Sequence, residues 1–244
     1  MPKVCIDPGH GGQHSGAVQN GIVEKDMVLP LSIYLGRFLQ MHGIEVVYTR
    51  TNDSTVSLEE RAAIANRAGA DFFLSVHADA SPNSPATRGH HVIASLRRDN
   101  SKVFATSILS SLFSATGRKA HSLGVWTRPY TAGSQVDYYG VLRYTKMPAN
   151  IVEVGFLTNP LDAALLKTNP ALLKLALGLG LGILAAFNIP ALARLNVDGE
   201  DYGLPLKIID GVSYAPVRST FEALGYNVGW SDAANAVTIT SPKK

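Results

Sequence analysis

The sequence predicts an α/β fold with a mostly parallel, doubly wound sheet, helices on both faces of that sheet, and a small α+β domain behind it. Short apolar runs alternate with segments of helical periodicity up to about residue 187. This alternation is typical of parallel strands joined by right-handed crossovers. The run Phe72–His77 is almost free of polar residues, as expected of a central strand covered on both faces. Beyond Pro190 the chain changes to short β-branched runs between turns, so we expect domains at 1–190 and 191–244.

The first part of the chain shows its elements through their end signals. The apolar strand 3–6 stops at a turn that begins with Asp7, and the helical spacing of 25–42 stops at Gly43. A strand at 44–48 follows. Ser57 and Glu60 are spaced as a capping box, which starts a helix that ends near Gly69. Residues 72–77 then form the central strand.

The alternation continues behind the central strand. In chain order we expect a strand at 91–95, a helix at 102–116, a long loop at 121–139, strands at 141–144 and 151–154, and helices at 161–166 and 170–187. The most apolar stretch, Leu175–Ala193, is interrupted by three glycines and Pro190. Because a membrane span needs about 20 apolar residues, we expect a buried helix here and no membrane span.

Residues 191–244 show the pattern of a small α+β domain. Asp210-Gly211 separates two β-branched runs, at 206–209 and 212–217, which is a hairpin signal. A short helix is expected at 218–224, and a closing strand at 237–240.

Composition limits the class of protein. The 244 residues are 46% hydrophobic and 17% charged, so the chain can bury a substantial core. Cys5 is the single cysteine, which excludes an intramolecular disulfide framework and any cysteine-based zinc finger. Bound zinc would therefore need histidines and carboxylates. The net charge of +3 is dispersed along the chain, so we expect no nucleic-acid partner.

Polar residues follow several predicted strands at the point where each strand ends. His10 follows the first strand, His77 ends the central strand, and Glu153 interrupts an apolar strand. Because the carboxyl ends of parallel strands meet at one edge of the sheet, we expect these residues there, with Glu24 at the start of the first helix. Two histidines and one carboxylate can hold a catalytic zinc, and a further carboxylate can serve as the base. Spacing does not decide which glutamate is the ligand. Strand-end histidines and a buried ion pair at Glu153 are the structural alternatives.

Six blocks of sequence carry a resemblance to a known family. They are Asp7–Gly12, Glu24–Asp26, Ser57–Arg61, Ala65–Asp71, Ser75–Asp79 and Met147–Asn159. In this order the blocks resemble the zinc-dependent N-acetylmuramoyl-L-alanine amidases of the type 3 family, over roughly residues 3–188. The resemblance implies that His10, Glu24 and His77 bind one Zn²⁺ and that Glu153 is the catalytic glutamate.

The implied reaction takes place on peptidoglycan. It hydrolyses the amide between the lactyl group of N-acetylmuramic acid and the L-alanine of the stem peptide. A zinc peptidase that cuts within the stem peptide would use a similar donor set. A non-catalytic wall-binding protein is the alternative from another class, although such a protein has no reason to keep Glu153 in an apolar strand.

Two departures from the family pattern concern the surroundings of the site. Asp79 stands where asparagine is more usual, and we expect it near the metal, where it could orient a ligand. Arg128 lies in the aromatic and basic segment 121–139, which would either line a substrate groove or form a packed surface loop. Residues 194–240 resemble the small domain named after the N-terminal region of copper amine oxidases. That domain would bind the wall or only stabilise the chain, and copper is not implied.

The N-terminus bears on where the protein acts. No apolar segment precedes Lys3, so the sequence shows no signal peptide. We expect synthesis in the cytoplasm and action on the bacterial wall after release, as in a phage-type lysin or a lysis-released amidase. A truncated secreted autolysin would look the same. We expect a monomer.

Overall fold

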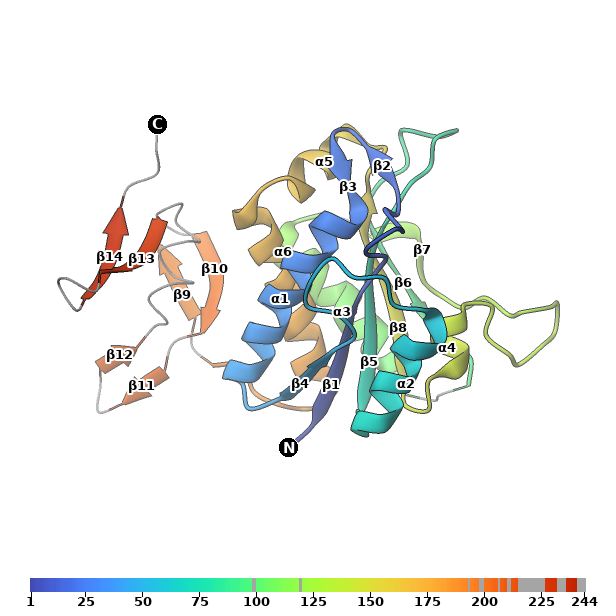
Figure 1. Cartoon of the computed structure of the whole chain (residues 1–244), viewed down its shortest axis with the longest axis horizontal. Coiled ribbons are helices and arrows are strands. Elements are labelled where there is room, and N and C mark those ends of the chain that lie inside the picture. The colour runs from blue at the N-terminus through green and yellow to red at the C-terminus, as the bar shows by residue number, and fades with distance from the viewer. Residues whose placement is uncertain are drawn as a thin grey trace.

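A six-stranded sheet forms the centre of the protein (Figure 1). The computed structural model describes residues 1–97, 100–118 and 120–192 and, from residue 194 on, the backbone of strands β9 to β14. The strands of the central sheet are β1 (Lys3–Pro8), β4 (Glu45–Tyr48), β5 (Phe72–Asp79), β6 (His90–Ala94), β7 (Ala120–Trp126) and β8 (Ala149–Phe156). Their order is β4-β1-β5-β8-β6-β7.

Most neighbouring strands of this sheet run parallel. The pairs β4–β1, β1–β5 and β5–β8 are parallel, whereas β6 runs antiparallel to β8. Strand β7 pairs in parallel with β6, so both strands run opposite to the rest of the sheet. The predicted class, α/β with a mostly parallel sheet, is confirmed. The reversed direction of β6 and β7 was not predicted from the sequence.

Helices cover both faces of the sheet. They are α1 (Glu24–Met41), α2 (Leu58–Ala68), α3 (Ser101–Thr116), α4 (Gly140–Tyr144), α5 (Pro160–Leu166) and α6 (Asn169–Ala186). One core layer joins Leu74 and its neighbours to α1, α3, α5 and α6, and the other joins Phe73 and Ile151 to α2 and α4. Alternate side chains of β5 therefore enter different layers, which explains why this strand is apolar on both faces.

Helix α6 is a core helix. It has the length and composition of a membrane span, with a mean hydropathy of 1.6, and 56% of it is buried inside the protein. It packs against α1 and α3. A Cβ atom on Gly182 would collide with the backbone of Ile108 in α3, so this glycine permits the close approach of the two helices. The expected buried helix is confirmed.

Two expectations for the middle of the chain were wrong. The strand expected at 141–144 is helix α4, in which the Arg143 amide donates to the Tyr139 carbonyl oxygen. A segment this short shows no periodicity, and its burial against α2 decides its conformation. The first part of the expected loop is the edge strand β7. Its side chains are mostly half-buried or exposed, so it lacks an apolar pattern. The short hairpin of β2 (Val18–Gln19) and β3 (Ile22–Val23) was also not predicted.

The local helix signals were correct. The Ser57 Oγ accepts a hydrogen bond from the Glu60 amide at 3.1 Å, and α2 ends at Gly69 in the left-handed region, with a φ of 62°. The Glu60 side chain pairs with Arg67 instead of closing the capping box.

The C-terminal segment contains three antiparallel strand pairs. They are β9 (Arg194–Val197) with β10 (Glu200–Pro205), β11 (Lys207–Ile209) with β12 (Val212–Tyr214), and β13 (Asn227–Ser231) with β14 (Ala236–Thr240). The expected hairpin pairing and closing strand are confirmed. The helix expected at 218–224 lies outside the described residues. Strand β10 lies against α6 and α1.

Candidate metal centre

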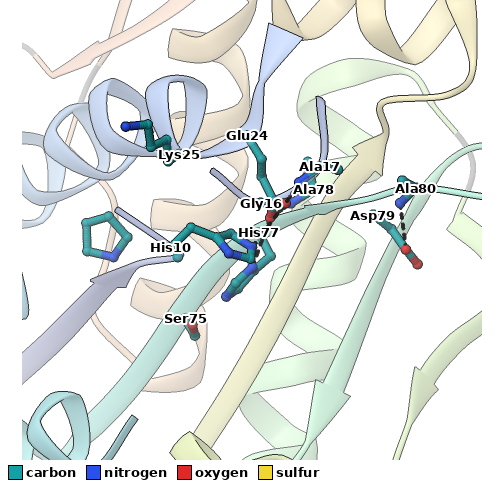
Figure 2. A network of polar contacts seen from close by, with 12 residues as sticks. His10, Gly16, Ala17, Glu24, Lys25, Ser75, His77, Ala78, Asp79 and Ala80 are labelled. Atoms are coloured by element: carbon teal, nitrogen blue, oxygen red, sulfur yellow. Dashed lines mark hydrogen bonds and ion pairs between the residues drawn. The ribbon is translucent and has the colours of Figure 1, made fainter. Parts of the chain in front are cut away.

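Three side chains from separate elements meet at the carboxyl ends of the central strands. His10 lies in the loop after β1, Glu24 is the first residue of α1, and His77 lies near the end of β5. They point toward one another (Figure 2). The His10 Nε2 is 3.1 Å from the Glu24 Oε2, and the His77 Nδ1 donates to the Glu24 Oε1 at 2.9 Å. One ligand atom from each residue lies within 4.8 Å of the others.

The backbone around Glu24 holds its carboxylate in place. The amide of Ala17 donates to Oε2 at 2.9 Å, and the amide of Ala78 donates to Oε1 at 3.1 Å. The side chain is 4% exposed. Gly16 has a φ of 68°, and a Cβ atom there would collide with the Glu24 carboxylate and the His10 ring. A side chain on Gly9 would likewise collide with the His77 ring. Both positions leave room for the cluster because they are glycines.

The electrostatics of the cluster favour a cation. Burial alone would raise the pKa of Glu24, but hydrogen bonds from His10 and His77 hold that pKa well below its usual range. Burial alone would lower the pKa of His77, but the Glu24 and Glu153 carboxylates raise it to about 9. A metal ion takes the place of such a proton when it binds. Two imidazoles and one carboxylate at these distances form a donor set that suits Zn²⁺.

Glu153 stands beside this cluster on the next strand. It is the register partner of His77 in the parallel β5–β8 pair, so the two side chains leave the same face of the sheet. The Glu153 Oε2 is buried and has no hydrogen-bond partner among the described residues. Burial is the main cause that raises the pKa of Glu153 to about 8; the Glu24 and Asp79 carboxylates act in the same direction, and His77 opposes them. A carboxyl group with this pKa can both accept and return a proton near neutral pH.

A buried ion pair between Asp7 and Arg61 stabilises the loop that contains His10. Asp7 accepts hydrogen bonds from Arg61 Nη1 at 2.6 Å, Ser75 Oγ at 2.6 Å and Thr49 Oγ1 at 2.5 Å. Arg61, from α2, also donates to the His10 carbonyl oxygen at 2.5 Å. His10 has a φ of 57°, a left-handed conformation that is costly for a residue with a side chain. The guanidinium therefore holds the loop in a strained conformation.

Sequence reasoning did not assign a role to Arg61 or Asp7. A signal was present, because Asp7 directly follows an apolar strand and Arg61 lies on the buried face of a capped helix. Nothing in the spacing of the two residues showed that they would meet.

A cavity of about 360 Å³ opens beside the cluster. His10 and His77 line it together with Arg61 and the apolar surface of Leu58 and Tyr139. A substrate group of moderate size can therefore reach the two histidines from a partly apolar pocket.

Asp79 lies near the cluster without a hydrogen bond to it, and Arg128 lies outside the cavity. The Asp79 carboxylate accepts from the Ala80 amide at 2.7 Å (Figure 2). It also lies 3.7 Å from the His91 Nε2. Within the described residues no hydrogen bond joins it to His10, Glu24 or His77. Arg128 lies over the Tyr138 ring, with its Cζ 3.8 Å from the ring centroid, and is not among the residues that line the cavity.

Comparison with known proteins places this site in a family. Residues 4–185 match the family model described as N-acetylmuramoyl-L-alanine amidase, a range that includes the cluster and Glu153. The chain belongs to the N-acetylmuramoyl-L-alanine amidase family. The family predicted from the sequence is confirmed. Residues 196–244 match the model described as the copper amine oxidase N-terminal domain.

Two curated amidases of Bacillus subtilis share between a third and two fifths of the aligned residues. The N-acetylmuramoyl-L-alanine amidase LytC of Bacillus subtilis (strain 168) is 38% identical over 168 residues, or 67% of this chain and 31% of LytC. The sporulation-specific N-acetylmuramoyl-L-alanine amidase of the same organism is 34% identical over 197 residues, or 78% of this chain and 69% of that protein. The chain thus matches about a third of the length of LytC.

Solved amidase structures share the fold. The catalytic domain of CwlV from Bacillus (Paenibacillus) polymyxa var. colistinus is 30% identical, with a TM-score of 0.68, and the match covers 78% of this chain and 100% of that domain. AmiC2 of Nostoc punctiforme is 32% identical, also with a TM-score of 0.68, over 77% of this chain and 97% of AmiC2. These amidase-family neighbours agree with the α/β class that the sequence predicted.

Proposed function

We propose that the chain is a zinc-dependent amidase of peptidoglycan. It hydrolyses the amide between the lactyl group of N-acetylmuramic acid and the L-alanine of the stem peptide. The observation that carries this proposal is the cluster of His10, Glu24 and His77 in a chain of the amidase family. Beside it lies the buried Glu153 Oε2, which has no hydrogen-bond partner within the part of the chain that the structure describes. The relatives named above are amidases, which supports the same reaction.

His10, Glu24 and His77 would hold the metal ion. Zn²⁺ bound there would polarise the scissile carbonyl and lower the pKa of a water molecule. The backbone amides of Ala17 and Ala78 keep the Glu24 carboxylate aimed at the two imidazoles. The three donors are therefore arranged before the ion arrives, which reduces the cost of ordering them.

Glu153 would move the proton. Its Oε2 accepts a proton from the attacking water as the new carbon–oxygen bond forms. The same carboxyl returns the proton to the nitrogen of L-alanine as the carbon–nitrogen bond breaks. The products are a lactyl carboxylate on the sugar and a free amine on the peptide. The raised pKa of about 8 suits a group that must make both transfers.

We also propose that residues 191–244 form a separate small domain that keeps the enzyme near its polymer. The match of residues 196–244 to a distinct family and the three antiparallel strand pairs support this division.

The test measures zinc content and product chemistry on the same samples. Wild type and Glu153→Gln are purified, their zinc is quantified, and purified cell wall is digested with each. We expect about one zinc per chain in both proteins and new L-alanine amines only with the wild type. Amines from residues within the stem peptide would instead indicate a peptidase. Full wall hydrolysis by protein without zinc would overturn the proposal.

A further inference from the structure

A hairpin lies between β7 and α4, at residues 127–139 (Figure 1). Two backbone hydrogen bonds close it, from the Tyr130 amide to Val136 at 2.7 Å and from the Tyr138 amide to Arg128 at 2.8 Å. Asp137 is 1% exposed and anchors its base, since its carboxylate accepts from the Ser95 hydroxyl at 2.7 Å and the Leu96 amide at 2.8 Å. A buried carboxylate therefore ties the base of the hairpin to Ser95 and Leu96.

The outer side of this hairpin carries aromatic rings paired with guanidinium groups. Tyr130 is 60% exposed, Tyr138 is 43% exposed and Tyr144, at the end of α4, is 39% exposed. The Arg128 Cζ lies 3.8 Å from the centroid of Tyr138, and the Arg143 Cζ lies 4.9 Å from that of Tyr130 and 5.0 Å from that of Tyr144. We call these five residues the tyrosine–arginine surface. Large exposed rings gathered on an anchored segment are typical of binding surfaces.

The charge of this surface is unbalanced. No ion pair within the described residues joins Arg128 or Arg143 to a carboxylate. Arg143 donates to the carbonyl oxygens of Asp137 and Tyr138, which carry no net charge. The one acidic side chain of the hairpin, Asp137, is turned inward. The surface thus presents two positive charges next to exposed rings.

The surface begins where the cavity beside the metal centre ends. Tyr139 lines that cavity together with His10 and His77. The Tyr138 ring meets the Tyr139 ring edge-on, with centroids 5.2 Å apart and an interplanar angle of 83°. A polymer that places one residue in the cavity can continue over Tyr138 and Arg128 without leaving the protein.

We propose that the tyrosine–arginine surface binds the glycan strand of peptidoglycan, and binds it most tightly where stem peptides have already been removed. This inference rests on the proposed function. The exposed rings can stack on sugar rings, and guanidinium groups bind carboxylates strongly. Amide hydrolysis leaves a free lactyl carboxylate on each muramic acid, whereas an uncut residue has a neutral amide at that position. The surface would therefore hold the cut part of a strand while the next amide enters the cavity.

Binding can be measured without turnover, on full-length protein that carries Glu153→Gln. The probes are peptide-free glycan strands with free lactyl carboxylates, and β-1,4-linked N-acetylglucosamine oligomers of equal length without carboxylates. Arg128→Gln combined with Tyr130→Ser should raise the Kd for the glycan strands at least fivefold. Arg128→Lys, which keeps the charge, should recover part of the loss. Arg37→Gln, an exposed arginine on α1, is the charge-matched control and should leave the Kd unchanged. Equal melting temperatures would confirm that the variants are folded.

A second measurement separates this inference from the proposed function. In the wild-type background, the ratio of amine release from whole cell wall to that from a soluble muramoyl dipeptide should fall at least fivefold in the hairpin variant. If the hairpin variant binds glycan as tightly as the wild type and the wild type is active, the proposed role of the tyrosine–arginine surface is wrong, but the proposed function stands. Equally tight binding of the uncharged oligomers would overturn the role of the carboxylates. A wild type that releases no L-alanine amine would overturn the proposed function, while the binding comparison would still decide whether the surface binds glycan.

Discussion

His77 and Glu153 are register partners on neighbouring parallel strands, β5 and β8. Strand pairing therefore sets the position of the proposed base relative to a proposed metal ligand, and no loop has to be ordered to bring the two together. Sites built on strands keep their geometry better than sites built on loops. Glu24, another proposed metal ligand, comes from the first turn of α1, and two backbone amides donate hydrogen bonds to its carboxylate.

Removal of the metal should abolish activity reversibly. We expect a chelator to reduce L-alanine amine release to background, and we expect Zn²⁺ to restore it, because the ion held by the cluster would polarise the scissile carbonyl. Amine release and zinc content are measured on the same samples. Activity that survives in protein stripped of zinc would contradict the metal assignment.

Arg61→Leu should destabilise the protein and weaken zinc binding. The substitution leaves Asp7 charged, buried and without its ion-pair partner, which typically costs about 3–5 kcal/mol. It also releases the carbonyl oxygen of His10. Chemical denaturation and zinc titration measure the two effects.

Arg67→Leu is the matched control for Arg61, on the same helix. Its side chain is 64% exposed and pairs with Glu60 on the surface, so its loss should lower the free energy of unfolding far less than the loss of Arg61. Equal losses in the two variants would show that burial of the Asp7–Arg61 pair has no special importance.

Gly16→Ala should impair zinc binding more than its backbone conformation alone explains. The new methyl group would press on the Glu24 carboxylate and the His10 ring, in addition to the cost of a left-handed alanine, about 1–2 kcal/mol. Gly43→Ala is the control, since Gly43 has a φ of 75° and nothing within 4 Å of the new methyl group. Both should lose similar backbone stability, but only Gly16→Ala should lose zinc affinity, as measured by titration.

Acid should destabilise the protein partly through His91. Burial, together with the nearby His121 and His90, lowers the pKa of this histidine to about 4, although Asp79 lies 3.7 Å away. In the unfolded chain the pKa returns to about 6.5. As the pH falls below 6.5, His91 becomes protonated in the unfolded chain but stays neutral in the folded protein. The unfolded state is therefore favoured, and stability present at pH 7 is lost between about pH 6.5 and pH 4.

His91→Phe isolates this contribution. Between pH 7 and pH 5 the wild type should lose on the order of 2 kcal/mol more unfolding free energy than the variant. Urea unfolding at the two pH values measures the difference. Parallel losses in both proteins would show that His91 is not the group responsible.

Local signals in the sequence were reliable where neighbours along the chain decide the structure. The Ser57 cap, the left-handed Gly69 and the central strand Phe72–His77 all lie where they were predicted. The prediction was wrong at Val141–Tyr144 and incomplete at Ala120–Trp126. Both segments are short, and contacts with α2 and with β6, far away in the sequence, decide their conformation.

The sequence by itself determined the family, the α/β class and the set of polar residues expected at the strand ends. Only the tertiary structure decided that the carboxylate of Glu24 lies between two imidazoles, while Glu153 keeps a buried oxygen that no described residue hydrogen-bonds. The same holds for the Asp7–Arg61 pair and for the rings and guanidinium groups of the hairpin. The physical reason is that distances between side chains on different elements depend on strand register and helix placement. Packing of the whole core sets these, and no local pattern of residues encodes them.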